Sequence, residues 1–291
     1  MQDLISKAAT LLEALPYIQK FAGATFVVKY GGSFMDSPDP SLRQGVARDI
    51  VFLEAVELNP VVVHGGGKAI TRALDRSGLK TEFVQGQRVT DAATVEIVDQ
   101  VLSREINPEI VTTINHLGGV AQGFAGTDIF TCRKLWLTGP SGERLDPGFV
   151  GEVIGVNTAP LLECLSHGFT PVISPTARGE DGRIYNCNAD VAAAMAAIAL
   201  KARRLVFMSD VPGLLRNPKD PSTLISHLRT GEVAALKQTG VVDKGMIPKV
   251  DSAVAALRAG VEKVQFVDGR IPHSVLLEIF TDAGVGTEVV P

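Results

Sequence analysis

Two short runs of β-branched residues, each ending abruptly at glycine, contain the residue types best suited to bind an anion. They are Phe26-Val-Val-Lys-Tyr-Gly-Gly32 and Val61-Val-Val-His-Gly-Gly-Gly67. Each is typical of a buried parallel strand whose carboxyl end passes into a glycine turn. Because glycine has no Cβ, backbone N–H groups can converge there, and Lys29 adds a positive charge. Either run alone could be a plain tight turn, but together they favour an anion site at the strand ends.

The glycines match neither of the two best-known phosphate loops. Gly65-Gly-Gly-Lys-Ala-Ile70 lacks the third glycine of the G-x-G-x-x-G motif, and Lys68 is followed by Ala69, where a Walker A loop requires Ser or Thr. This disfavours a nicotinamide-dependent dehydrogenase and a P-loop kinase. We interpret His64, beside the glycines, as structural rather than as an acid or base.

Polar residues near two predicted helix starts could complete a site for an anionic substrate. Arg88 precedes a long helix, where its planar guanidinium suits a carboxylate, although a surface salt bridge is the usual role of such an arginine. Asn186, Asn188 and Asp190 open an alanine-rich helix. They could be turn and cap residues, or the amides could orient a ligand while Asp190 holds lysine ammonium groups in place.

Lys249 is a second candidate for such a lysine. It lies in the first turn of a predicted helix that begins at Pro248, within Gly245-Met-Ile-Pro-Lys-Val250. A helix N-terminus carries partial positive charge, so a lysine is poorly matched to it unless a bound polyphosphate reverses the local field.

Composition favours a globular protein of one large or two modest domains. The chain has 291 residues, of which 45% are apolar and 21% charged, and its formal charge is −4 without a basic block, which disfavours a nucleic-acid partner. Cys132, Cys164 and Cys187 form no C-x-x-C pair, which argues against disulfides and structural zinc. Because no signal-peptide pattern and no apolar stretch of about 18 residues is present, we expect a cytoplasmic location and no membrane partner.

The order of the predicted elements indicates how the polar residues could meet. Strand 26–30, helix 42–58, strand 61–64 and a helix behind Gly67 alternate as in a parallel sheet covered by helices. A long helical region is expected from 92 toward 117. Segments 120–124, 130–137 and 150–156 predict a small antiparallel flap, and the alternation resumes from 204. A helix over 1–20 should be kinked or interrupted near Ala14 by Pro16.

Taken in order, the motifs resemble those of the amino acid kinase superfamily over nearly the whole chain. They are Phe83-x-x-Gly-x-Arg-Val-Thr-Asp91, Asn186-x-Asn-Ala-Asp190, Ser209-Asp-Val-Pro-Gly213 and Gly245-Met-Ile-Pro-Lys249. The resemblance implies an α/β fold, a three-layer αβα sandwich with a central, mainly parallel open sheet and inserted β-hairpins. It also implies an N-terminal helix at 1–21, a substrate-binding lobe at 22–190, and a lobe at 191–291 that binds ATP and carries an arginine site.

Within this superfamily, the motifs are similar to those of the enzymes that act on N-acetyl-L-glutamate. The resemblance implies ATP-dependent phosphorylation of its side-chain carboxylate, the second step of arginine biosynthesis. Mg²⁺ would be held by the nucleotide phosphates, with no metal site of the protein's own. Since a carboxylate is already a competent nucleophile at neutral pH, this reaction needs positioning and charge neutralisation rather than a general base.

The resemblance also implies a role for each site residue. Lys29 and Lys249 would stabilise the transferring phosphoryl group, and Asp190 would organise both lysines. The other implied roles are phosphate binding by Gly31 and Gly32, contact with the substrate's reacting end by Gly66 and Gly67, contact with its other carboxylate by Arg88 and Asn186, and contact with the nucleotide by Ser209, Asp210, Gly213 and Met246.

Both chain ends resemble those of the arginine-inhibited members of this group. Their N-terminal helix interlaces between dimers to form a hexamer, a trimer of dimers, and a PII-type signalling protein is a further partner that the resemblance allows. Tyr17, Glu278 and Gly284 would belong to an L-arginine site. Three departures from the group's pattern are Gln265 in place of a common His, Lys68-Ala69 in place of Pro-Gln, and Lys244 in place of a glycine.

Two other functions remain open from the sequence. A kinase for a related acylated amino acid, of the aminoadipate type, would grip the same α-carboxylate, and the length of the pocket would separate the two substrates. A non-catalytic arginine-sensing protein would use the fold for binding alone, although the presence of Lys29, Lys249 and Asp190 argues against it.

Overall fold

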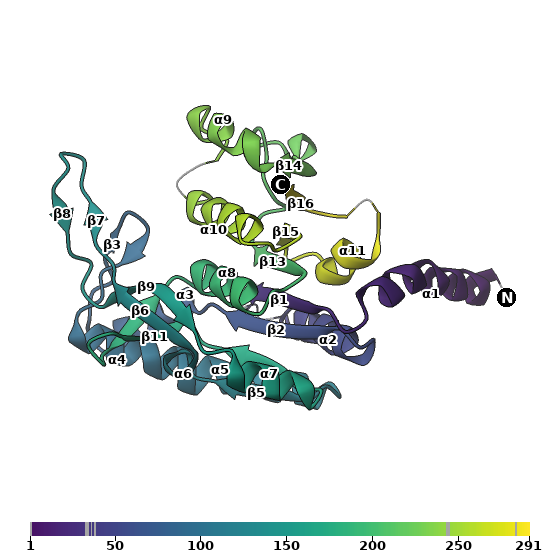
Figure 1. Ribbon diagram of the computed structural model, residues 1–291, viewed down its shortest axis with the longest axis horizontal. Helices are drawn as coiled ribbons and strands as arrows, with labels where there is room; N and C mark the ends of the chain where they lie inside the picture. The colour runs from purple at the N-terminus through teal and green to yellow at the C-terminus, as the bar shows by residue number, and fades with distance from the viewer. Residues whose placement is uncertain (1, 33–34, 36, 38, 243–244, 283) are drawn as a thin grey trace.

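A mainly parallel sheet forms the centre of the molecule (Figure 1). The structure, a computed structural model, describes residues 2–32, 35, 37, 39–242, 245–282 and 284–291, so Lys244 lies outside the described residues. Among these, the sheet has eight strands, and the last strand in sequence, β16, pairs antiparallel with β15. In spatial order they are β14 (His227–Arg229), β16 (Thr287–Val290), β15 (Lys263–Asp268), β13 (Arg204–Ser209), β1 (Thr25–Tyr30), β2 (Asn59–His64), β10 (Thr170–Ile173) and β5 (Ala121–Phe124).

The register of the central strands brings the two glycine turns, residues 31–32 and 65–67, to the same edge of the sheet. In β1 and β2 every residue after the first is buried, as the valine-rich runs predict for strands covered on both faces. Tyr30 is paired with His64 at the ends of these parallel strands. The Gly65 N–H donates to the Tyr30 carbonyl at 2.7 Å, so the two turns lie side by side.

Helices cover both faces of this sheet and give the predicted three-layer arrangement. Helices α7 (Ala159–Ser166), α8 (Ala189–Ala199) and α10 (Ile247–Arg258) bury their apolar residues against one face. On the other face lie α2 (Pro40–Ala55), α5 (Asn107–His116) and α11 (Ser274–Phe280). Helix α3 (Gly67–Arg76) packs on α4 (Ala92–Asp99) in a third, smaller cluster. The short helices are α6 (Gly126–Ile129), α9 (Val233–Gln238) and the 3₁₀ turns Pro221–Thr223 and Thr230–Glu232.

The inserted strands differ in part from the predicted flap. A small closed barrel is formed by β11 (Thr176–Gly179), β12 (Ile184–Cys187), β9 (Val150–Val156) and β6 (Phe130–Lys134). Two separate hairpins are β3 (Phe83–Val84) with β4 (Gln87–Arg88), and β7 (Leu137–Thr138) with β8 (Arg144–Leu145). The prediction was wrong for 120–124, because β5 pairs parallel with β10 at the edge of the main sheet. The chain between these two strands, residues 125–169, supplies the long crossover that a parallel pair requires.

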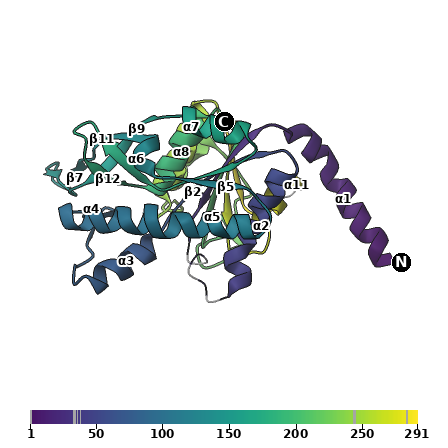
Figure 2. The ribbon, with the colours of Figure 1, turned by 90° about the horizontal axis from the view of Figure 1, so that it is seen from below.

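The two longest predicted helices compare differently with the structure. The helical region predicted from 92 toward 117 is confirmed, and within it a π-helix (Gln100–Ile106) connects α4 and α5. By contrast, α1 (Gln2–Phe21) runs without interruption through Pro16, because an interior proline removes one backbone hydrogen bond without having to end a helix. Helix α1 projects away from the rest of the molecule (Figures 1 and 2), and Leu11 and Leu12 on it are exposed.

Candidate functional site

Lys29, Asp190 and Lys249, here called the Lys–Asp–Lys cluster, meet between the sheet and two helices. Lys29 comes from β1, Asp190 from the first turn of α8, and Lys249 from the first turn of α10. Asp190 Oδ1 lies 3.1 Å from Lys29 Nζ, and Asp190 Oδ2 lies 2.6 Å from Lys249 Nζ. The carboxylate therefore bridges two ammonium groups, one 161 residues before Asp190 and one 59 residues after it in sequence, and the cluster keeps a net positive charge.

Burial and the attraction between opposite charges shift the pKa values of this cluster in opposite directions. Burial would raise the pKa of Asp190, but the attraction of Lys29 and Lys249 outweighs it and holds that pKa below its ordinary value. Burial lowers the pKa of Lys249, and the attraction of Asp190 opposes this only in part. Asp190 is thus ionised at neutral pH and fixes both lysines beside the glycine turns.

The first glycine turn leaves space for the lysine of the cluster. A Cβ on Gly31 would come within 2.5 Å of Lys29 Nζ, so any side chain at this position would displace the ammonium group. Gly32 has φ of +151°, a backbone conformation that favours glycine. These two residues therefore let backbone N–H groups and the lysine approach the same point.

A cavity of about 260 Å³ lies on one side of the cluster and contains the predicted substrate residues. Gly66, Gly67, Arg88, Asn186 and Asp190 all line it. Its position at the carboxyl ends of the parallel strands is where ligands bind in open α/β sheets.

Arg88 is buried in this cavity and braces the second glycine turn. Its guanidinium donates to the Gly67 carbonyl and to Thr71 Oγ1, both at 3.0 Å, and to Thr81 Oγ1 at 3.2 Å. Burial lowers the pKa of Arg88 from its ordinary value, and the guanidinium remains charged at neutral pH. Thr71 and Thr81 were not predicted from the sequence. The available signal is that Thr71 stands one helical turn after Gly67, which places it near the second glycine turn.

A second cavity, of about 330 Å³, lies on the other side of the cluster and contains most of the predicted nucleotide residues. Its lining residues are Lys29, Gly31, Gly32, Met208, Ser209, Asp210, Val211, Gly245, Met246 and Lys249. Gly213 is not brought into this cavity, because it packs against Thr287 and has no room for a Cβ there. Since Lys29, Gly31 and Gly32 line both cavities, they form a wall shared by the two cavities.

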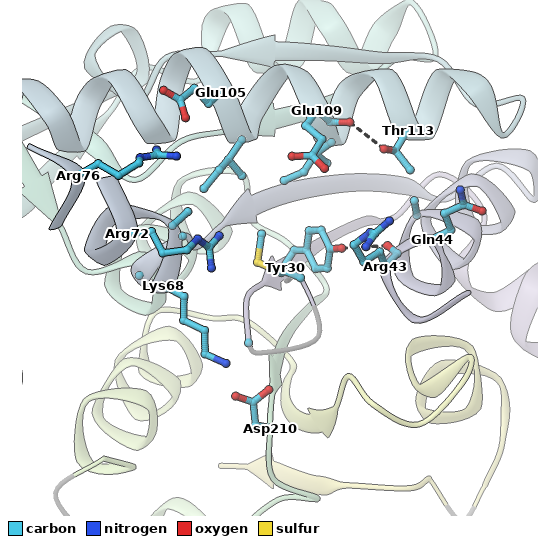
Figure 3. Close-up of a pocket in the computed structure, with 18 residues that line it drawn as sticks. Tyr30, Arg43, Gln44, Lys68, Arg72, Arg76, Glu105, Glu109, Thr113 and Asp210 are labelled. Carbon is cyan, nitrogen blue, oxygen red and sulfur yellow. Dashed lines mark hydrogen bonds between the residues drawn. The ribbon is translucent and has the colours of Figure 1, made fainter. Parts of the chain in front are cut away.

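A larger cavity, of about 550 Å³, adjoins the glycine turns between α2, α3 and α5 (Figure 3). Lys68, one of the departures noted in the sequence, lines it and points toward Asp210. Charged side chains from α2, α3, the π-helix and α5 also line it, and they are Arg43, Arg72, Arg76, Glu105 and Glu109. Sequence reasoning did not find this cavity, although Lys68, Arg72 and Arg76 follow each other at four-residue intervals.

His64 is structural, as the sequence suggested. It is fully buried, and burial lowers its pKa to about 4, so the ring is neutral at physiological pH. Its Nδ1–H donates to the Gly65 carbonyl at 2.8 Å, and Asn107 Nδ2 approaches Nε2 at 3.4 Å. The ring therefore supports the second glycine turn instead of exchanging protons.

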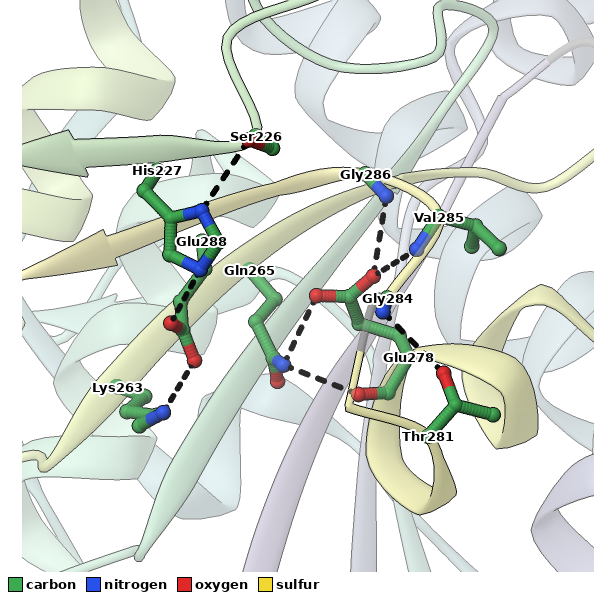
Figure 4. Close-up of polar contacts among 10 residues, drawn as sticks. All are labelled: Ser226, His227, Lys263, Gln265, Glu278, Thr281, Gly284, Val285, Gly286 and Glu288. Atoms are coloured by element: carbon green, nitrogen blue, oxygen red, sulfur yellow. Dashed lines mark hydrogen bonds and ion pairs between the residues drawn. The ribbon is translucent and has the colours of Figure 1, made fainter.

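The predicted arginine-site residues lie together at the junction of α1 and α11 (Figure 4 shows the C-terminal part). Glu278 is buried, and its carboxylate accepts from the Val285 N–H at 2.7 Å, the Gly286 N–H at 3.0 Å and Gln265 Nε2 at 3.0 Å. A Cβ on Gly284, which has φ of +60°, would come within 2.8 Å of this carboxylate. Tyr17 on α1 donates to Asp282, which links the helix to the same segment.

Within the described ranges, no three His, Cys, Asp or Glu side chains converge to hold a metal ion. Over the same residues, no helix combines the length and the apolar character needed to cross a membrane. All three cysteines are free and buried.

Sequence comparison relates the chain to one enzyme family along its length. Residues 24–268 match the model of the amino acid kinase family. The chain is 47% identical to the acetylglutamate kinase of Heliobacterium modesticaldum, with 100% of both chains covered. It is 48% identical to the acetylglutamate kinase of Geobacter metallireducens, with 99% of both chains covered.

Solved structures agree with this relationship. The N-acetylglutamate synthase of Neisseria gonorrhoeae, in complex with coenzyme A and N-acetyl-glutamate, superposes with a TM-score of 0.84 at 25% identity; 98% of this chain is covered, but only 63% of the synthase. The same synthase has been solved with coenzyme A and L-arginine, with a TM-score of 0.80 at 26% identity, covering 97% of this chain and 65% of the synthase. The carbamate kinase of Giardia shares the fold, with a TM-score of 0.66 at 14% identity, over 92% of this chain and 99% of that one.

Proposed function

Because the chain belongs to the amino acid kinase family, we propose that it has acetylglutamate kinase activity. It transfers the γ-phosphoryl group of ATP to the side-chain carboxylate of N-acetyl-L-glutamate, which gives N-acetyl-L-glutamyl 5-phosphate and ADP in arginine biosynthesis. Two observations together support this reaction: full-length relatives of 47% identity carry this activity in their names, and the Lys–Asp–Lys cluster lies between two cavities, with Lys29 lining both.

The cluster is the single structural feature that carries the proposal. A phosphoryl group in transfer spreads negative charge over its oxygens, and catalysis then depends on positioning and charge neutralisation. Lys29 and Lys249 supply the positive charge, and Asp190 keeps them in place before the substrates arrive. No residue has to accept a proton, since the attacking carboxylate is already ionised at neutral pH.

The substrate carboxylates bind at opposite ends of the smaller cavity in this proposal. Gly66 and Gly67 receive the reacting carboxylate, while Arg88 and Asn186 receive the α-carboxylate. A buried arginine already held by the Gly67 carbonyl and by Thr71 keeps its charge in a fixed position and can offer its remaining N–H groups to a carboxylate. The same contacts align the reacting oxygen with the shared wall.

ATP occupies the cavity on the other side of that wall. Gly31 and Gly32 meet its phosphates, and Ser209, Asp210 and Met246 border the rest of the nucleotide. The positive cluster and the open glycine backbone fit a polyphosphate. Mg²⁺ carried by the nucleotide phosphates would supply further charge neutralisation when bound. In this division, residues 22–190 hold the acid and 191–291 hold ATP.

We also propose that L-arginine inhibits this enzyme and that α1 links dimers into a hexamer. The exposed leucines of α1 need a covering surface, and Tyr17 joins this helix to the segment that contains Glu278 and Gly284. The related synthase that binds L-arginine supports an effector of this kind in the shared fold. Docking of a PII-type protein and a cytoplasmic location complete the proposal.

The test is acyl phosphate formation with MgATP, measured by trapping with hydroxylamine. N-acetylglutamate, N-acetylaspartate, glutamate and N-acetylaminoadipate are compared, each with and without arginine. We expect turnover with N-acetylglutamate and suppression by arginine. Preference for the aminoadipate derivative would replace the substrate assignment. Arginine binding without turnover of any acid would favour a sensor over a kinase.

A further inference from the structure

The π-helix between α4 and α5 lies beside the substrate cavity. Figure 2 shows α4 and α5 in line along one side of the molecule, and the apolar spacing of 92–117 alone predicts one continuous α-helix. π-Helical turns are rare and occur frequently at functional sites. Two sets of contacts connect this turn, residues 100–106, to the second glycine turn and to the strand pair that carries Asn186, both of which contribute to the cavity lining.

The apolar contacts lead to the second glycine turn. Leu102 is buried and lines the substrate cavity together with Arg88 and Asn186. A Cβ built on Gly66 would come within 2.7 Å of Leu102 Cδ2 and within 2.5 Å of Ile106 Cδ1. The π-helix thus packs directly on the backbone of the turn that receives the reacting carboxylate.

The polar contacts lead to the barrel strands that carry Asn186. Ser103 Oγ lies 2.8 Å from both Asp99 Oδ1 and Ser174 Oγ, and Thr176 Oγ1 lies 3.2 Å from Asp99 Oδ1. A carboxylate can only accept, so Ser103 and Thr176 both donate to Asp99. The Ser174 hydroxyl must then donate to Ser103, and it accepts from the Gly126 N–H at 2.9 Å. The donor and the acceptor are therefore defined for each of these hydrogen bonds.

These contacts connect the π-helix to both groups of residues that hold the carboxylates of the acid in the proposed function. Thr176 stands opposite Asn186 in the antiparallel pair of β11 and β12, so a hydrogen bond to Thr176 fixes the strand that holds Asn186. Leu102 and Ile106 fix Gly66 at the other end. The separation between Gly66 and Asn186 must match the length of the amino acid chain between its two carboxylates.

We propose that the π-helix sets the length of the acid that this site accepts, with Leu102 as the specificity-determining residue and Asp99 and Ser103 as positioning residues. The inference rests on the proposed function, since it assigns the two ends of the cavity to the two carboxylates. It concerns the choice between N-acetylglutamate and N-acetylaminoadipate, which differ by one methylene group. A methylene in an apolar pocket changes selectivity by about 10- to 200-fold.

The first test is the Leu102→Ala variant, assayed by the ratio of kcat/KM for N-acetylaminoadipate to kcat/KM for N-acetylglutamate. The space left by the leucine side chain should raise this ratio by at least about 10-fold. The matched control is Ile114→Ala, which truncates a buried side chain on α5 against a different core cluster. A ratio in Leu102→Ala within about threefold of the wild-type ratio would overturn the proposal. Should Leu102→Ala fail to fold, Leu102→Val is judged by the same ratio with a smaller expected rise.

The second test separates positioning from general stability. Ser103→Ala should raise KM for N-acetylglutamate by about 10-fold through loss of a buried hydrogen bond, while KM for ATP stays unchanged. Ser103→Thr keeps the hydroxyl and should restore most of the affinity for the acid. Equal changes in both KM values, or no change in either, would contradict the positioning role. If the wild-type protein phosphorylates N-acetylglutamate and only these variants disagree, the inference alone fails; no turnover by the wild type overturns the proposed function as well.

Discussion

Asp190→Asn is the substitution that tests the role of the Lys–Asp–Lys cluster with the least change to the rest of the fold. It removes one negative charge from between Lys29 and Lys249 and leaves the side-chain volume almost unchanged. Two buried ammonium groups then face each other without a counter-charge. We expect both a less stable protein and a slower phosphoryl transfer.

The size of the effect follows from the contacts of the carboxylate. At 3.1 Å from Lys29 Nζ, with an effective dielectric constant of about 20, the Coulomb attraction is roughly 5 kcal/mol before desolvation is subtracted. Breaking a buried ion pair by removing one partner costs about 3–5 kcal/mol of unfolding free energy. Loss of preorganised charge at the transferring group should lower kcat by about 10²- to 10³-fold.

The assay combines hydroxylamine trapping at saturating MgATP and N-acetylglutamate with urea unfolding of the same preparation. Asp251→Asn is the matched control, because Asp251 on α10 pairs with Lys237 at the protein surface. An exposed pair contributes at most about 1 kcal/mol, so this variant should keep its kcat. If Asp190→Asn folded and retained kcat within about threefold of the wild type, the proposed role of the cluster would be refuted.

Three further predictions follow from single residues. Burial lowers the pKa of Lys249, so kcat/KM for ATP should fall as pH rises through a value below 10.5. Lys249→Arg should move this fall in kcat/KM to higher pH, and a fall at the same pH in both proteins would contradict the prediction. Arg88→Lys loses the fork geometry and should raise KM for N-acetylglutamate by about 10- to 100-fold with little change in kcat, as measured by initial rates; an unchanged KM would place the α-carboxylate elsewhere. Burial raises the pKa of Asp49 from 3.8 to about 6, although His273 opposes it. Since the folded state then holds this proton more tightly, wild-type stability should fall by about 2–3 kcal/mol relative to Asp49→Asn as pH rises from about 4 to 6, and parallel urea-unfolding curves for the two proteins across this range would speak against it.

The sequence predicts best those parts of the site that depend on parallel strands. Lys29 and the two glycine turns follow runs of buried β-branched residues, and strand ends of a parallel sheet share one edge, so their proximity could be inferred. Lys249 was predictable from an unfavourable charge at a helix N-terminus. Its contact with Asp190 needed the arrangement of α8 and α10, which local sequence does not specify.

The features that sequence did not predict depend on tertiary contacts. The π-helix has no local signature, because the apolar spacing of 92–117 fits a continuous α-helix and the wider turn is fixed by contacts with Gly66 and Ser174. Segment 120–124 pairs with a strand nearly fifty residues later, which hairpin patterns cannot indicate. Gly213 packs closely on Thr287 and does not line the cavity that contains Ser209 and Asp210, an arrangement that depends on the neighbouring strand.

Direct transfer of the phosphoryl group to the substrate carboxylate is the central claim, and an isotope experiment tests it most directly. N-acetylglutamate labelled with ¹⁸O in the side-chain carboxylate is converted with MgATP, and the acyl phosphate is trapped with hydroxylamine, which attacks carbon and releases the bridging oxygen with the phosphate. The released phosphate should contain one ¹⁸O atom for each hydroxamate formed, as measured by mass spectrometry. Phosphate without ¹⁸O would show that ATP had been hydrolysed by water and would contradict the mechanism.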